Sequence, residues 1–218
     1  MAAALFGVGT IHGQYKQIKS AAPAQTVVAK PWYGPEETLL GAYLNNNDSI
    51  SFRNDQVTGT PYEWGYVFTA SKKGQITKLG VRMPRFVPAG PPATVYTVSL
   101  WDYESRQLIK QTTVEIEDIR FNYKELDSPV PVVANKKYVI SVFVRPAGNN
   151  AGPWPYYTII KPGQNNSAAP FLPITSGPLT LLTALSGSGN SPDFPATISY
   201  HTDILSGLCD FVFVPMEK

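Results

Sequence analysis

Residues 94–102 have the sequence TVYTVSLWD, in which apolar side chains occupy both alternating sets of positions. Successive side chains of a β-strand point to opposite faces of the sheet, so this pattern indicates a strand covered on both faces. Residues 137–144, KYVISVFV, have the same pattern and are followed closely by Pro146. The first segment is therefore predicted to be a central strand, and the second a well-buried strand that ends before the proline.

Other strand-like segments follow one another at the short spacing typical of β-sandwiches and barrels. These segments are residues 65–70, 75–83, 107–115, 122–126, 129–133, 156–160 and 208–214. The turn residues Lys72-Lys73-Gly74 predict a hairpin between the first two. In the second of these, Ile76 is out of phase with the apolar positions that follow it, which predicts a bulge near Thr77.

The chain contains 17 Gly and 20 Pro, too many for a helix bundle, and no segment has a convincing helical period. Residues 179–185 fit either one turn of helix or an edge strand, and residues 162–178 are predicted to form a loop. The last strand is predicted to end at Pro215. We therefore predict an all-β fold: an antiparallel, jelly-roll-like β-sandwich that residues 36–218 form as a single domain.

Residues 1–35 show no sustained strand or helix period, and are predicted to form an extended N-terminal arm or the remnant of a secretion signal. An apolar run, AAALFGV at residues 2–8, and an A-x-A pattern at residues 22–24 resemble parts of a signal peptide. However, no Lys or Arg precedes the apolar run, and Lys16 and Lys19 separate it from the A-x-A pattern. Both interpretations therefore stay open.

The charge balance argues against nucleic acid as a partner. The chain has 18 Lys and Arg against 16 Asp and Glu, a formal net charge of +2, which is too weak to hold a phosphate backbone or an anionic membrane. Charged residues make up 16% of the chain, well below the roughly 25% of an average soluble domain. This composition suits an extracellular β protein. No stretch is long and apolar enough to predict a membrane span.

Several motifs follow one another in a characteristic order. They are E-T-L-L-G at residues 37–41, G-x-x-F-T at 65–69, G-x-I-T-x-L-G-V-R at 74–82, Y-T-V-S-L-W-D at 96–102, P-V-P-V-V-A-N-K-K-Y-V at 129–139, F-P at 194–195 and L-C-D-F-V-F at 208–213. This order resembles a bacterial extracellular β-sandwich family that is classed as a domain of unknown function. Asn135 stands where that family usually has a turn glycine, which costs little because Asn tolerates left-handed backbone. The resemblance covers about residues 36–215. It implies a sandwich in secreted or surface-attached proteins, with no known catalysis and no functional residues to transfer.

Catalytic and metal-binding patterns are weak in this sequence. His12 and His201 have no second ligand at the spacing of a metal site, and the lone Cys209 is predicted to be a small buried apolar group. No G-x-S-x-G elbow supports a nucleophilic hydrolase. We therefore predict no catalytic residue, no metal and no cofactor. Asp210 lies in an otherwise apolar strand, and is predicted either to face solvent or bond to backbone donors, or to be a calcium ligand.

Aromatic residues make up 12% of the chain, and one group of them follows a loop rich in Gly, Asn and Pro. This group is Trp154, Tyr156 and Tyr157, with Pro155 stiffening the backbone that carries the rings. Flat rings in such a position can stack on sugars or on the surface of a partner protein. We predict these three residues to be ligand-binding. The alternative is that they cap the end of the sandwich core.

These features favour a non-catalytic recognition module, secreted or at the cell surface, that binds glycans or mediates adhesion. The alternative is a structural subunit of an extracellular filament, sheath or surface assembly, in which residues 1–35 add a strand to the sheet edge of a neighbouring subunit. The predicted partners are accordingly a glycan or other protein subunits, including further copies of this chain as a homo-oligomer. An enzyme is the weakest interpretation.

Overall fold

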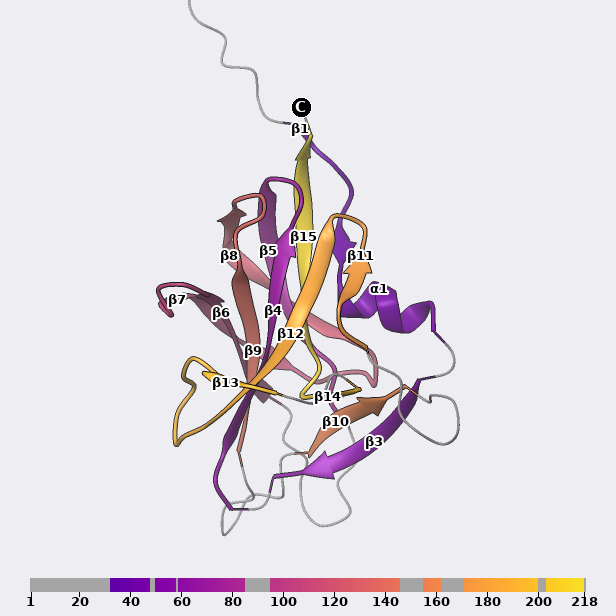
Figure 1. The fold of residues 1–218 in the computed structure, drawn as a ribbon, viewed down its shortest axis with the longest axis vertical. Coiled ribbons are helices and arrows are strands. Elements are labelled where there is room, and N and C mark those ends of the chain that lie inside the picture. Colours follow the sequence, from indigo (N-terminus) through magenta and orange to yellow (C-terminus); the bar gives the residue numbers. More distant parts are fainter. Residues whose placement is uncertain are drawn as a thin grey trace, which may run out of the picture. The chain divides into compact units, whose positions relative to one another are not determined.

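The computed structural model describes residues 32–47, 50–57, 59–84, 95–145, 155–161, 171–199 and 203–217. The chain from Pro31 onward is one compact unit. Antiparallel strands make up most of it, and the described residues contain a single helix, α1 (Leu40–Asn45) (Figure 1). The predicted all-β, antiparallel sandwich is confirmed. Most of residues 1–35, together with Trp154, His12 and His201, lie outside the described residues.

The larger sheet has the strand order β11-β12-β4-β9-β6-β7, with β13 paired to β12. Its strands are β4 (Tyr62–Ala70), β6 (Val95–Asp102), β7 (Leu108–Glu115), β9 (Tyr138–Val144), β11 (Ile174–Ser176), β12 (Leu179–Ser188) and β13 (Thr197–Ile198). Strand β6 lies between β7 and β9, and every residue of β9 is buried. The central position of the first and the burial of the second are as predicted from their alternating apolar residues.

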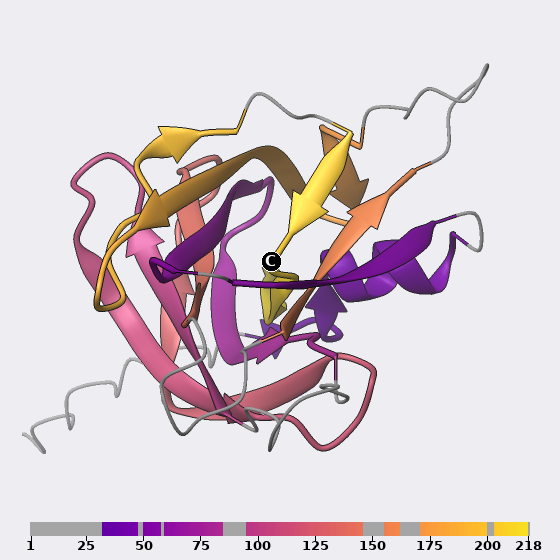
Figure 2. The same cartoon turned by 90° about the horizontal axis from the view of Figure 1, so that it is seen from below.

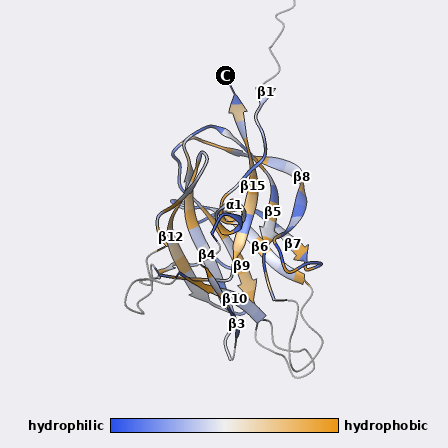
Figure 3. Cartoon of the chain, turned by 90° about the vertical axis from the view of Figure 1, so that its right-hand side faces the viewer, coloured by the Kyte–Doolittle hydropathy of each residue, from blue (hydrophilic) through white to orange (hydrophobic). Residues whose placement is uncertain are grey.

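The second sheet has the order β1-β15-β5-β8, with β2 also paired to β15. Its strands are β1 (Trp32–Tyr33), β2 (Glu37–Thr38), β5 (Gly74–Val81), β8 (Asn122–Val132) and β15 (Cys209–Glu217). The main core lies between the two sheets, where the rings of Phe68 on β4 and Phe211 on β15 approach to 4.2 Å between centroids. Figure 3 shows β15 as mainly apolar and β8 as mainly hydrophilic, in keeping with their buried and exposed patterns.

A third, three-stranded sheet has the order β14-β10-β3. Its strands are β3 (Ser51–Gln56), β10 (Pro155–Ile160) and β14 (Ile204–Ser206). Figure 2, seen from below, shows β3 and β10 crossing the end of the sandwich. The helix α1 immediately precedes β3 in the chain and packs beside β11 and β15. These elements form the surroundings of the cleft described below.

The predicted hairpin between residues 65–70 and 75–83 is wrong. Strand β4 pairs with β12 and β9 in the larger sheet, whereas β5 pairs with β15 and β8 in the second sheet. The short turn after Ala70 therefore carries the chain across the core from one sheet to the other. A Lys-Lys-Gly turn suits both arrangements, because turn residues set the local bend and not the choice of pairing partner. The bulge near Thr77 is confirmed, since the register with β8 shifts between Ile76 and Lys78.

Other differences concern segments whose local composition misleads. The two predicted strands at residues 122–126 and 129–133 are one strand, β8, which ends at Val132. It includes Pro129 and Pro131 and stands at the edge of its sheet, where proline is tolerated. Residues 179–185 are neither a helix nor an edge strand, because β12 has pairing partners on both sides. The predicted loop at residues 162–178 contains β11.

Strand β15 runs past Pro215, where an end was predicted, to Glu217. At this point the strand needs no N–H group from Pro215. The Pro215 carbonyl accepts a hydrogen bond from the Gly34 N–H, and the next residue, Met216, donates its N–H to the Lys73 carbonyl. The missing proline N–H therefore leaves the pairing intact. Within the predicted arm, Trp32 and Tyr33 pair with the last residues of the same strand and enter the sheet.

Candidate functional site

The two predicted site residues that the structure describes, Tyr156 and Tyr157, point to opposite faces of the three-stranded sheet because they are consecutive on β10. The Tyr156 ring lies 5.8 Å from Trp64, which itself stacks on Tyr62. The Tyr157 ring instead contacts Phe52 edge to face, at 5.4 Å between centroids. These two tyrosines therefore do not form one flat platform, and each has its own aromatic neighbours.

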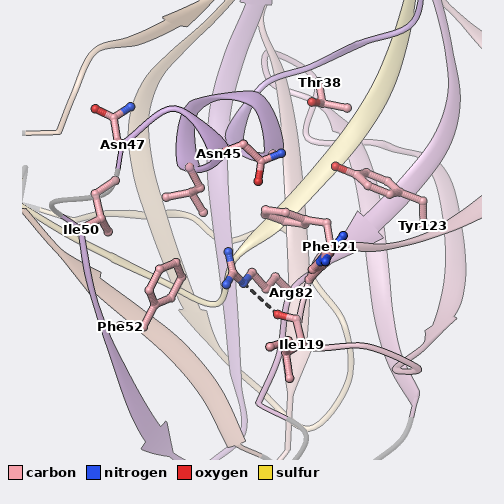
Figure 4. Close-up of a pocket in the computed structure, with 12 residues that line it drawn as sticks. Thr38, Asn45, Asn47, Ile50, Phe52, Arg82, Ile119, Phe121 and Tyr123 are labelled. Carbon is pink, nitrogen blue, oxygen red and sulfur yellow. Dashed lines mark hydrogen bonds between the residues drawn. The ribbon is translucent and has the colours of Figure 1, made fainter.

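Beside Phe52, a cleft of about 880 Å³ opens between α1, β3, the end of β5 and the segment that leads into β8 (Figure 4). The side chains that line it include three kinds that can contact a ligand: aromatic rings, amides and cations. They are the aromatic Phe52, Phe121 and Tyr123, the amides Asn45 and Asn47, and the cations Arg82 and Arg120. Among the described residues, no Asp or Glu lines the cleft. The arrangement offers flat apolar faces beside polar groups that donate hydrogen bonds, with a positive balance of charge.

Arg82 is held firmly at the inner wall of the cleft. Its Nε donates to the Ile119 carbonyl at 2.9 Å, and its guanidinium carbon lies 4.2 Å from the centre of the Phe52 ring. Burial lowers the pKa of Arg82 from its usual value, an effect that Tyr157 and Asp118 partly oppose, and the side chain stays a cation at neutral pH. Figure 4 shows the guanidinium between Phe52 and Ile119.

Asp210, the acid that stood out in the sequence, is buried on β15 behind the cleft and bonds to backbone donors, one of the predicted alternatives. Its Oδ1 accepts the Leu39 N–H at 3.2 Å, and its Oδ2 accepts the Gly41 N–H at 2.7 Å and the Tyr123 hydroxyl at 3.0 Å. Burial raises the pKa of Asp210, and these hydrogen bonds oppose the rise. The carboxyl group thereby joins α1 and β8 to the core.

Two glycines make room for Tyr123 in this wall. A Cβ atom on Gly80 would lie 2.3 Å from Tyr123 Cδ1, and one on Gly41 would lie 2.8 Å from the Tyr123 hydroxyl. Such distances are far inside van der Waals contact, so glycine is required at both positions for the ring to lie where it does. Burial raises the pKa of the Tyr123 hydroxyl, as does the neighbouring Asp210, so the hydroxyl stays a donor to that carboxyl group.

A second buried acid, Glu63, lies on the outer face of the larger sheet. It is 3% exposed, and it accepts the Ser141 hydroxyl at 2.5 Å, while Ser141 Oγ accepts the Trp101 indole N–H at 2.8 Å. Burial raises the pKa of Glu63 to about 8, with a contribution from Asp193. Pro195 covers this region, and its ring fits against Gly65. None of these residues lines the cleft.

The described residues offer no ready site for a metal ion. No group of three or more His, Cys, Asp or Glu side chains among them is placed to hold one. Cys209 is a buried free thiol, as predicted, and burial raises its pKa. Within the same part of the chain, no helix has the length and apolar character needed to cross a lipid bilayer.

The cleft was not predicted from the sequence. Its residues come from three separate parts of the chain, residues 38–52, Arg82 and residues 119–123, and no local pattern connects Arg82 with Phe52. One weak signal was present: the run Asn45-Asn46-Asn47 follows apolar residues of α1 and supplies two of the lining amides. A second signal was Gly80, a glycine inside the bulged strand β5.

Comparison with known proteins gives a family but no function. A family model described as a domain of unknown function, DUF4082, matches residues 51–191. This confirms the resemblance to a domain-of-unknown-function family, over a shorter range than residues 36–215. No curated protein matches the chain.

A search of solved structures aligns the chain with the D1-D2-D3 domains of the flagellar cap protein FliD from Escherichia coli. The sequence identity is 12% and the TM-score is 0.09. The alignment covers 84% of this chain and 57% of that one.

Proposed function

This chain belongs to the DUF4082 family, and we propose that it is a non-catalytic recognition module, secreted or at the cell surface, that binds carbohydrate in the cleft lined by Phe52 and Arg82. The single observation that carries the proposal is the lining of that cleft. Exposed aromatic carbon lies beside amide and guanidinium donors in a cavity of about 880 Å³. Such a volume falls in the usual range of small-ligand sites.

Each part of the lining has a role in binding a sugar. Phe52 is 38% exposed, and part of its ring is free to stack on the apolar face of a pyranose. Asn45 and Asn47 have side chains that both donate and accept, which suits hydroxyl groups. The described lining offers no pair of carboxylates and no histidine, so we assign it a binding role and no chemical step.

Binding can be tested by affinity electrophoresis in gels that contain neutral and acidic polysaccharides. We expect Phe52→Ala to weaken binding about tenfold, the loss of one stacking contact. Ile198→Ala is the matched control, because Ile198 is an exposed apolar residue on β13 that does not line the cleft. It should leave binding unchanged, and circular dichroism should show that both variants are folded.

The same gels separate the cleft from the site predicted from the sequence. If Trp154→Ala or Tyr156→Ala abolishes binding while Phe52→Ala does not, the ligand binds at residues 154–157 and the cleft assignment is wrong. If no polysaccharide retards the wild-type protein, the proposed function is refuted.

A second candidate is the structural subunit, and one observation favours it. Trp32 and Tyr33 pair with the end of β15 and form the strand β1 at the edge of a sheet. A segment in that position can reach a neighbour and add a strand to its sheet. Deletion of residues 1–30, which leaves β1 intact, should then abolish an oligomer that light scattering detects for the full chain. An unchanged oligomer after this deletion would reject the arm as the connection.

A further inference from the structure

We propose that the cleft selects polysaccharides that carry carboxylate groups, and that Arg82 is the residue that receives the carboxylate. The inference concerns the site of the proposed function and depends on it. The charge of the cleft lining and the contacts that hold the Arg82 guanidinium both favour a carboxylate ligand.

The charge of the lining is entirely positive. Arg82 and Arg120 are its charged residues, and no Asp or Glu among the described residues lines the cleft. Asp210, behind the wall, is buried, and its carboxylate accepts hydrogen bonds from α1 and Tyr123. The described lining of this cavity thus carries two cations and no anion, although Asp118 lies beside both arginines and offsets part of their charge. Such a site attracts anionic ligands over neutral ones.

Within the described residues, the contacts of Arg82 leave the edge of the guanidinium that carries its two terminal nitrogens available to a ligand. Its flat face is covered by the Phe52 ring at 4.2 Å, and its Nε is bonded to the Ile119 carbonyl. Among the described residues, no carboxylate forms an ion pair with it. Within the described part of the chain, the two terminal nitrogens make no hydrogen bond, so they offer donors in the plane of the guanidinium. A planar carboxylate accepts two parallel hydrogen bonds from such an edge.

The surroundings of the second cation, Arg120, bear on how many charges the ligand carries. Arg120 is 85% exposed in its side chain and lies at 4.0 Å from the Asp118 carboxylate, which offsets part of its charge. Arg82 is the cation that is held in place, by Phe52 and the Ile119 carbonyl, and Asp118, which acts on its pKa, forms no ion pair with it. One fixed guanidinium matches a sugar chain with single, spaced carboxylates, whereas densely sulfated chains need clusters of cations.

The test compares each acidic polysaccharide with its own uncharged form. Polygalacturonate, alginate and hyaluronan are each presented to the wild-type chain beside a methyl-esterified sample of the same polymer, and affinities are measured by isothermal titration calorimetry. We expect at least one acid to bind about tenfold more tightly than its ester, the difference made by a charge-assisted bond. Arg82→Gln should abolish this preference, and Arg82→Lys, which keeps the charge but not the planar fork, should retain part of it.

Arg106→Gln is the matched control, because the Arg106 guanidinium also lies over an aromatic ring, that of Phe194 at 5.5 Å, and it does not line the cleft. It removes the same charge and should leave the preference for acids intact. If the esters bind as tightly as the acids, the selection of carboxylates is wrong while carbohydrate binding stands. If sulfated dextran binds more tightly than every carboxylated polymer and Arg82→Gln removes that binding, the ligand class is wrong. If neither acids, esters nor neutral polymers bind, the proposed function itself fails.

Discussion

Replacement of Glu63 by Gln should change how the stability of the fold depends on pH. Glu63 is buried on the outer face of the larger sheet, where it accepts the Ser141 hydroxyl, and burial raises its pKa to about 8. In the unfolded chain a carboxyl group of this kind titrates near 4.5. Between these two values the folded chain keeps a proton that the unfolded chain has lost, so the free energy of unfolding falls as the pH rises. The stabilising effect is complete below about pH 4.5 and is lost at about pH 8.

The size of the effect follows from the separation of the two pKa values. Each pH unit between them corresponds to about 1.4 kcal/mol, so a rise from 4.5 to about 8 corresponds to at most about 5 kcal/mol of stability. Entry of water around the ionised group would reduce this loss to about 2 kcal/mol. Both values are a large part of the stability of an ordinary domain. The amide of the Glu63→Gln variant keeps an acceptor for Ser141 and has no proton to lose, so the variant should lack this dependence.

Urea denaturation followed by far-ultraviolet circular dichroism, at intervals from about pH 5 to about pH 8, measures the effect. The useful quantity is the difference between wild type and Glu63→Gln, because His12, His201 and the nearby Asp193 are common to both. Glu115→Gln, at an exposed position of β7, is the matched control and should follow the wild type. Parallel curves for wild type and Glu63→Gln across this range would show that the Glu63 carboxyl group does not hold its proton on folding.

Three further substitutions test the packing around the cleft and the second buried network. Gly80→Ala should lower stability by about 1–3 kcal/mol, measured by urea denaturation, and weaken polysaccharide binding, because the new Cβ would lie 2.3 Å from the Tyr123 ring. Asp210→Asn should cost about 1–3 kcal/mol, because an amide cannot accept all three bonds that the carboxylate accepts, and hydrogen exchange should show faster opening of α1. Trp101→Phe, which removes the indole bond to Ser141, should lower the melting temperature without changing polysaccharide binding.

The parts of the fold that could be predicted are the strands whose apolar residues follow an alternating pattern. The buried strand at residues 138–144 and the central strand at 95–102 carry apolar side chains on both faces, and the phase error at Ile76 marked a real bulge. Pairing was not predictable in the same way. The turn after Ala70 has the composition of a hairpin, but the strands on either side find their partners elsewhere, in segments that lie far along the chain. Long-range pairing depends on the whole set of strands, which a local pattern does not contain.

The cleft was beyond prediction for a related reason. A helix of six residues such as α1 is too short to show a period, and it has no side-chain cap of its own. At its start, the Ala42 N–H donates to the Thr38 hydroxyl, while the N–H groups of Leu39 and Gly41 donate to Asp210, 171 and 169 residues later in the chain. The sequence singled out Asp210 as an acid in an apolar strand, and bonds to backbone donors were among the predicted alternatives. Nothing in the local pattern indicated that these donors belong to the wall of a binding cavity.

The position of Asp210 explains how the cleft is held in shape. An isolated helix of this length is unstable, so α1 depends on the bonds that it makes with the body of the protein. Those bonds come from β15, one of the most buried strands, and the same carboxyl group holds the Tyr123 hydroxyl on the opposite wall. Two walls from distant parts of the chain are thus fixed to one buried group. A ligand can bind in such a cavity without ordering the backbone of the protein. The binding free energy that a flexible loop site would lose to ordering is therefore not lost here.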